Sequence, residues 1–160
     1  QDGLYMPRMN SLDANLYEVH PEGVQEAIPG GPKKGNWKKP YSPVFLYKWD
    51  ESYKSLKQDG KLFEYKNPLN GGPVMPTMGA RLELINKPTN LKRHTGSVVY
   101  QVATGRGWTE LADQRFEWEE KDIFCVPAWT RYRHGAHEES VLFSFNDFPA
   151  MRALGLYREE

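Results

Sequence analysis

Hydrophobic and polar residues alternate with a period of two through most of the chain from Pro76 onward. This alternation places successive side chains on opposite faces of a β-strand. Turn residues separate the alternating segments, which are 81–85, 98–103, 116–119, 122–126, 131–134 and 141–145. Short strands separated in this way predict an all-β sandwich or barrel. Segment 148–155 is predicted to form a short final helix, because Gly155 ends its helical pattern.

The first part of the chain has a different pattern. Residues 1–43 carry many Gly, Pro, Asn and Lys residues and show no period that would build a core. We expect residues 1–75 to form an extended inter-domain arm that lies on a partner surface, with a short helix near 50–58. Residues 76–160 are then the barrel domain, which includes the C-terminal helix.

Composition excludes several classes of function. The 160 residues suit one domain, and 21 basic residues balance 21 acidic residues, so no nucleic-acid partner is expected. The sequence has no apolar run of the ~20 residues that a membrane span requires. The single cysteine, Cys125, lies in an apolar segment and is predicted to be a buried, inert thiol. One cysteine permits no internal disulfide, which favours a cytoplasmic location.

The barrel segment has the frame of the cupin motifs, G-x5-H-x-H-x3-E-x6-G and G-x5-P-x-G-x2-H-x3-N. Gly105, Pro127 and His94 fall at the motif spacing. In a metal-binding cupin, two histidines on one strand face, a glutamate and a histidine from the second motif hold a divalent metal. Other residues stand at three of these ligand positions: Lys92, Val98 and Tyr132. This sequence therefore predicts the cupin barrel, a double-stranded β-helix or jelly roll, without its usual metal site.

The residues at the ligand positions define a candidate pocket of Lys92, His94, Tyr132 and Trp129. No catalytic residue is assigned in this chain and no complete metal site is expected, since a lysine ammonium has no free lone pair. His94 and His134 remain weak metal candidates. We expect His94 to be a buried imidazole bonded to Tyr132 or to a backbone group. Lys92 is predicted either to replace part of the metal charge, bonded to Tyr132 or a buried water, or to extend into solvent.

Two further groups of side chains are candidates for a functional role. His134 and His137 are three residues apart, and both are expected at the surface or at an interface. Three tryptophans could stack on an aromatic substrate, but positions in the barrel wall or at an interface are more typical of Trp; they are Trp108, Trp118 and Trp129.

Several blocks of the sequence, taken together, resemble the gentisate 1,2-dioxygenase family, which includes salicylate and 1-hydroxy-2-naphthoate dioxygenases. The blocks are 42–49, 65–72, 75–79, 93–100, 126–129, 142–147 and 153–159. Members of this family are bicupins. The resemblance implies that an N-terminal cupin binds Fe(II) through three histidines and cleaves an aromatic ring with O₂. It further implies that the present chain is the C-terminal cupin half.

The resemblance leads to one main hypothesis and two alternatives. The main hypothesis is a non-catalytic half, inactive by itself and free of cofactor, that supports the Fe(II) cupin of an extradiol-like dioxygenase and its homo-oligomer. One alternative is a stand-alone, metal-free cupin that binds a small carboxylic acid. Another is a single-cupin enzyme with unusual ligands such as His94, Tyr132 and His134.

Overall fold

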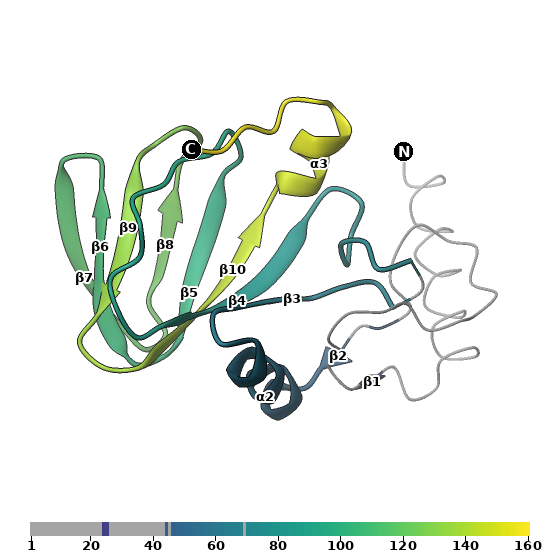
Figure 1. The fold of residues 1–160 in the computed structure, drawn as a ribbon, viewed down its shortest axis with the longest axis horizontal. Coiled ribbons are helices and arrows are strands. Elements are labelled where there is room, and N and C mark those ends of the chain that lie inside the picture. Colours follow the sequence, from purple (N-terminus) through teal and green to yellow (C-terminus); the bar gives the residue numbers. More distant parts are fainter. Residues whose placement is uncertain (1–23, 26–43, 45, 69) are drawn as a thin grey trace, which may run out of the picture.

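The alternating segments form two β-sheets that face each other across a hydrophobic core (Figure 1). The structure is a computed structural model, and it describes residues 24–25, 44, 46–68 and 70–160. Strand β5 (Val98–Thr104) shows how the pattern becomes structure. Val98, Tyr100 and Val102 are buried, whereas Val99 and Gln101 between them are exposed.

The larger sheet has five antiparallel strands and the smaller has three. In spatial order the larger sheet contains β3 (Leu62–Glu64), β4 (Gly79–Ile85), β10 (Ser140–Asn146), β5 and β8 (Ile123–Val126). The smaller sheet contains β7 (Gln114–Glu119), β6 (Arg106–Leu111) and β9 (Tyr132–Ala136). A separate parallel pair joins β1 (Val24–Gln25) to β2 (Leu46–Tyr47).

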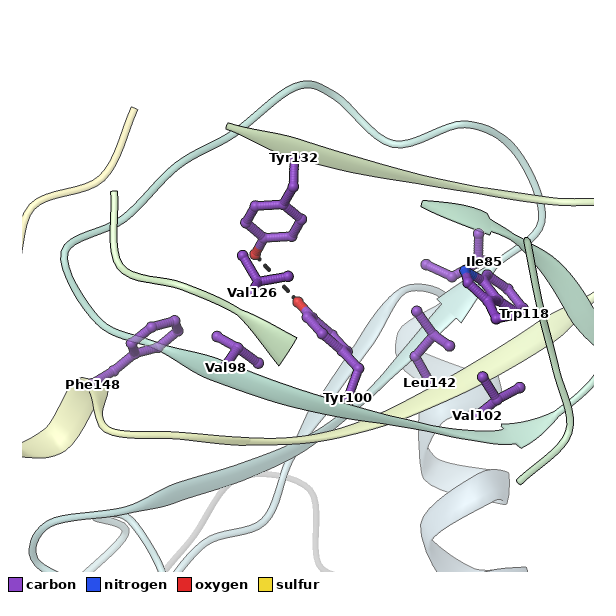
Figure 2. Packing of buried hydrophobic residues seen from close by; sticks show 9 residues of the cluster. All are labelled: Ile85, Val98, Tyr100, Val102, Trp118, Val126, Tyr132, Leu142 and Phe148. Carbon is purple, nitrogen blue, oxygen red and sulfur yellow. Dashed lines mark hydrogen bonds between the residues drawn. The ribbon is translucent and has the colours of Figure 1, made fainter. Parts of the chain in front are cut away.

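The main core fills the space between the two sheets. Figure 2 shows Tyr100 and Tyr132 pointing toward each other from opposite sheets, with aliphatic side chains around them. Leu142 and Val126 are completely buried there, and each such side chain stabilises the fold by about 1.5 to 3 kcal/mol. The barrel interior is thus packed with side chains.

Helix α2 (Trp49–Asp59) covers part of the outer face of the larger sheet. Its Leu56 is completely buried against Phe63, Leu82 and Val141 from three strands. This end of the sheet is therefore buried on both faces. Helix α2 occupies the segment that the sequence indicated as helical, and the final helix, α3, spans Phe148–Ala153.

In the two main sheets, the strands correspond to the alternating segments, with two additions. Strands β3 and β6 were not predicted, and β3 shows that the sheet begins before residue 76. The expectation for Cys125 was wrong: it lies on the outer face of edge strand β8 and is exposed. The arm predicted over residues 1–43 lies outside the described residues, apart from strand β1.

Candidate functional site

Polar side chains gather inside the barrel, beside the hydrophobic core and between strands β4, β5 and β9. Strand β4 contributes Arg81 and Glu83, and β5 contributes Tyr100. Strand β9 contributes Tyr132 and His134, and the segment before β5 contributes Lys92 and His94. Backbone hydrogen bonds between Lys92 and Tyr132, in both directions, attach that segment to β9.

Glu83 is the centre of this group. Its carboxylate contacts Arg81 Nη2 at 2.9 Å and Lys92 Nζ at 3.3 Å. Only 8% of the Glu83 side chain is exposed, against 13% for Arg81 and 25% for Lys92. Burial alone raises the pKa of Glu83, but the charges of Arg81 and Lys92 lower it to about 2. Glu83 is therefore an anion held between two cations.

A line of polar contacts runs from Glu83 to His94 through two tyrosines. Tyr100 Oη donates to Glu83 Oε1 at 3.2 Å, and the two tyrosine oxygens are 3.2 Å apart (Figure 2). His94 Nε2 is 2.8 Å from Tyr132 Oη, and His94 Nδ1 is 2.7 Å from the Gly96 carbonyl. Because a carbonyl only accepts, His94 carries its proton on Nδ1, and Nε2 accepts from Tyr132. Burial lowers the pKa of His94 and keeps the ring neutral.

His134 lies beside this line and is completely buried, so its expected place at the surface was wrong. Strand alternation directs it inward, while the exposed His137 contacts Glu117 at 2.6 Å. His134 Nδ1 is 2.8 Å from Thr109 Oγ1, which also accepts from Trp118 Nε1 at 2.9 Å. The Thr109 oxygen has a proton and a second lone pair, so this hydrogen bond forms with either tautomer of His134. In the described part of the chain, Nε2 has no hydrogen-bond partner.

Burial lowers the pKa of His134 to about 3, which makes stability depend on pH. An unfolded histidine has a pKa of about 6.5, so below pH 6.5 the unfolded chain takes up a proton that the folded chain does not. Stability therefore falls as the pH drops from about 6.5 toward 3. At pH 5 this amounts to about 2 kcal/mol, from 1.36 kcal/mol for each pKa unit.

We expect His134→Gln to remove this contribution. The difference in unfolding free energy between pH 7.5 and pH 5 should shrink by about 2 kcal/mol. Urea denaturation at the two pH values measures it. A pH dependence equal to that of the unchanged protein would contradict the buried, neutral state of His134.

The predicted pocket residues are only partly brought together. Lys92, His94 and Tyr132 meet inside the barrel, and His94 has the hydrogen bonds expected of it. Lys92 Nζ lies 5.1 Å from the centre of the Tyr132 ring, but its hydrogen-bond partner is Glu83, which the sequence did not indicate. Trp129 is separate from the group: 39% of it is exposed, and it stacks with Arg93 at 4.4 Å.

The other two tryptophans also have structural positions. Trp118 is buried in the core between the sheets. Trp108 is half-buried on β6, with the guanidinium of Arg115 4.1 Å from the centre of its ring. Trp118 packs in the same cluster as Tyr100 and Tyr132, and Thr109 links it to His134 by hydrogen bonds.

The interior residues do not fit a divalent metal. Both nitrogens of His94 are hydrogen bonded, and burial raises the pKa of Tyr132, which keeps its phenol protonated. The Glu83 carboxylate already binds Arg81 and Lys92, and these two positive charges would repel a metal cation beside it. Among residues 46–68 and 70–160, no three His, Cys, Asp or Glu side chains are grouped to hold a metal ion. Charged side chains occupy the interior where a metal-binding cupin holds its ion.

The chain is similar in sequence to ring-cleaving dioxygenases. No protein-family model matches the chain. Gentisate 1,2 dioxygenase 1 of Aquipseudomonas alcaligenes is 32% identical over 182 residues, covering 99% of this chain and 52% of that protein. The 5-aminosalicylate 1,2-dioxygenase of Comamonas sp is 32% identical over 184 residues, covering 99% of this chain and 49% of that protein.

Over nearly its whole length the chain is similar to members of the gentisate 1,2-dioxygenase family. It spans about half the length of the curated relatives it matches. Salicylate 1,2-dioxygenase from Pseudoaminobacter salicylatoxidans, in a crystal structure of its adducts with gentisate, superposes with a TM-score of 0.73 and 28% identity. The superposition covers 83% of this chain and 41% of that one.

The superposition with a family member confirms the all-β cupin fold that the alternating pattern and the motif frame predicted. Within the described ranges, neither helix is long and apolar enough to cross a lipid bilayer. Salicylate 1,2-dioxygenase and this chain therefore share the barrel.

Proposed function

We propose that this chain is the C-terminal, non-catalytic cupin half of a gentisate-type ring-cleaving dioxygenase. In this proposal it packs against an N-terminal cupin, whose Fe(II) supplies the oxygen chemistry, and it contributes to a cytoplasmic homo-oligomer. In this proposal the segment before β3 connects the two halves, and the second barrel begins at β3. The observation that supports this proposal most directly is that nearly the whole chain aligns with about half of each relative.

The barrel interior supports a non-catalytic role. Glu83, Arg81 and Lys92 neutralise one another in part, and the Tyr132 hydroxyl donates to His94 and lies beside the Tyr100 hydroxyl. A ring-cleaving centre needs open metal positions for substrate and oxygen. A barrel filled with paired charges and hydroxyls provides a rigid wall instead.

The outer face of the larger sheet supports a packing role. Strand register places Phe145 beside Val99 and Val99 beside Cys125, and all three lie on this face. Phe145 is 47% exposed, Val99 is 40% exposed, and Ile123 on the same face is 66% exposed. Apolar side chains gathered in this way mark surfaces that another protein surface covers.

The mass of the native subunit tests this proposal. An immunoblot of the source cells with antibodies against the chain should show one polypeptide of about twice 18.5 kDa, or this chain co-purifying with a second cupin chain. Antibodies against the buried core of an unrelated cupin serve as the control for specificity. A native subunit of 18.5 kDa that purifies alone would contradict the role as a supporting half.

A further inference from the structure

A cavity of about 340 Å³ lies where the edge formed by β3 and β4 meets the segment of residues 86–92. It shares Arg81, Glu83 and Lys92 with the interior polar group, and these are among its less exposed lining residues. From there it opens outward past Lys61 and Lys87, which are exposed. The cavity therefore reaches the interior charges from solvent without passing through the core.

The cavity has an excess of positive charge. Four cationic and two acidic side chains line it: Lys61, Arg81, Lys87, Lys92, Glu83 and Glu159. The excess is two positive charges, although the whole chain has a formal net charge of zero. Positive side chains gathered in a partly enclosed space attract anions, because the surrounding protein reduces solvent screening.

Donors in the cavity remain available after the internal ion pairs are made. Arg81 Nη2 binds Glu83 and Arg81 Nε is covered by protein atoms, so Arg81 contributes positive charge to the cavity but no accessible Nε–H donor. Lys92 has three N–H donors and donates one to Glu83. Its side chain is 25% exposed, so the two remaining N–H groups can donate to an anion in the cavity.

The remaining wall is apolar. Leu62, Leu84, Ile85 and Pro88 line the cavity beside the charged groups. We propose that this cavity binds a small organic carboxylate, with its carboxylate at Arg81 and Lys92 and its apolar body against these side chains. The proposal does not depend on the role as a supporting half, because it concerns this barrel alone.

Calorimetric titration with benzoate, benzamide and inorganic phosphate tests the site on the 160-residue chain at pH 7 and low salt. Benzoate should bind with a Kd of about 1 mM or below, as expected for a small ligand with one charged and one apolar contact. Benzamide has the same shape without the charge and should bind at least about tenfold more weakly. Phosphate, which lacks an apolar body, should also bind more weakly than benzoate.

Two variants locate the site. Lys92→Met removes the charge and keeps most of the length of the side chain, and it should weaken benzoate binding about fivefold or more. The double variant Lys61→Met, Lys87→Met changes only exposed residues at the mouth, so it tests the site even if Lys92→Met does not fold. It should weaken binding by a similar factor. Lys54→Met, on the exposed surface of α2 and outside the cavity, is the control and should bind as the unchanged chain does.

The titrations have outcomes that would overturn the proposal. Benzoate binding weaker than about 10 mM would do so, as would equal binding of benzoate and benzamide. Unchanged affinity in the double variant would show that the anion binds elsewhere. Phosphate binding tighter than benzoate would indicate a general anion site and would also contradict the proposed ligand class.

Discussion

Replacing Glu83 with Gln is expected to lower the free energy of unfolding by about 3 to 5 kcal/mol at pH 7. Gln has the same size but no charge, so the buried guanidinium of Arg81 and the half-buried ammonium of Lys92 lose their shared counter-ion. Removing one partner of a buried ion pair leaves an uncompensated charge, and that residual charge accounts for the loss. Urea denaturation followed by circular dichroism measures it.

Two further variants separate the buried charge from the substitution itself. Glu120→Gln makes the same chemical change at an exposed position and should alter stability by less than about 0.5 kcal/mol. In the double variant Arg81→Met, Glu83→Leu the ion pair is replaced by apolar groups, and stability should recover in part. A Glu83→Gln protein as stable as the Glu120→Gln protein would show that the interior ion pairs are not needed for folding.

The second large effect is expected at Gly107, where β6 approaches both of its neighbours. A Cβ atom on Gly107 would collide with the carbonyl oxygen of Gly135 and would lie 2.5 Å from the Trp118 ring and 2.8 Å from Ala136 Cα. Two of these contacts are with backbone, which cannot move without breaking the register of β6 and β9. Gly107→Ala should therefore cost about 3 kcal/mol or more, measured by the same denaturation.

Gly60→Ala provides the matched comparison. Gly60 ends helix α2 with a φ of 81°, and a Cβ there would meet no atom within 4 Å. Gly60→Ala should then lower the free energy of unfolding only by the cost of placing an alanine in the left-handed backbone conformation, about 1 to 2 kcal/mol. If the two variants were equally stable, close strand packing at Gly107 would not be a determinant of this barrel.

The sequence predicted most of the barrel because alternation and turn residues act locally. It missed β6 because glycine disfavours strands, although here Gly107 is what allows two strands and Trp118 to approach. It missed β3 because three residues cannot show a period. The exposed Cys125 shows a related difficulty, since an apolar segment at a sheet edge can face outward.

The site was harder to predict because the larger sheet is buried on both faces where β4 passes under helix α2. In β4, Leu82 and Leu84 alternate with Arg81 and Glu83, and alternation alone places the leucines inside the barrel. The structure reverses this: Leu82 packs under helix α2, so the interior receives the charged pair. The inner and outer faces of β4 can be assigned only when the position of helix α2 is known. No local sequence pattern contains that information.

The pairing of His94 with Tyr132 was accessible to sequence reasoning, because the motif frame fixes both positions relative to Gly105 and Pro127. Trp129 was not, because it adopts a positive φ of 59° in a turn and its side chain is exposed over Arg93. A motif therefore locates residues on strands well, and residues in turns poorly.

Iron content and oxygen uptake of the purified chain test the central claim most directly. The 160-residue chain, incubated with Fe(II) under nitrogen, desalted and then mixed with gentisate in air, should contain far less than one iron per chain and consume no oxygen above the buffer rate. Salicylate 1,2-dioxygenase treated in the same way provides the positive control. One tightly bound iron per chain, with ring cleavage at a rate comparable to that control, would show that this half is itself the catalyst and would contradict the account.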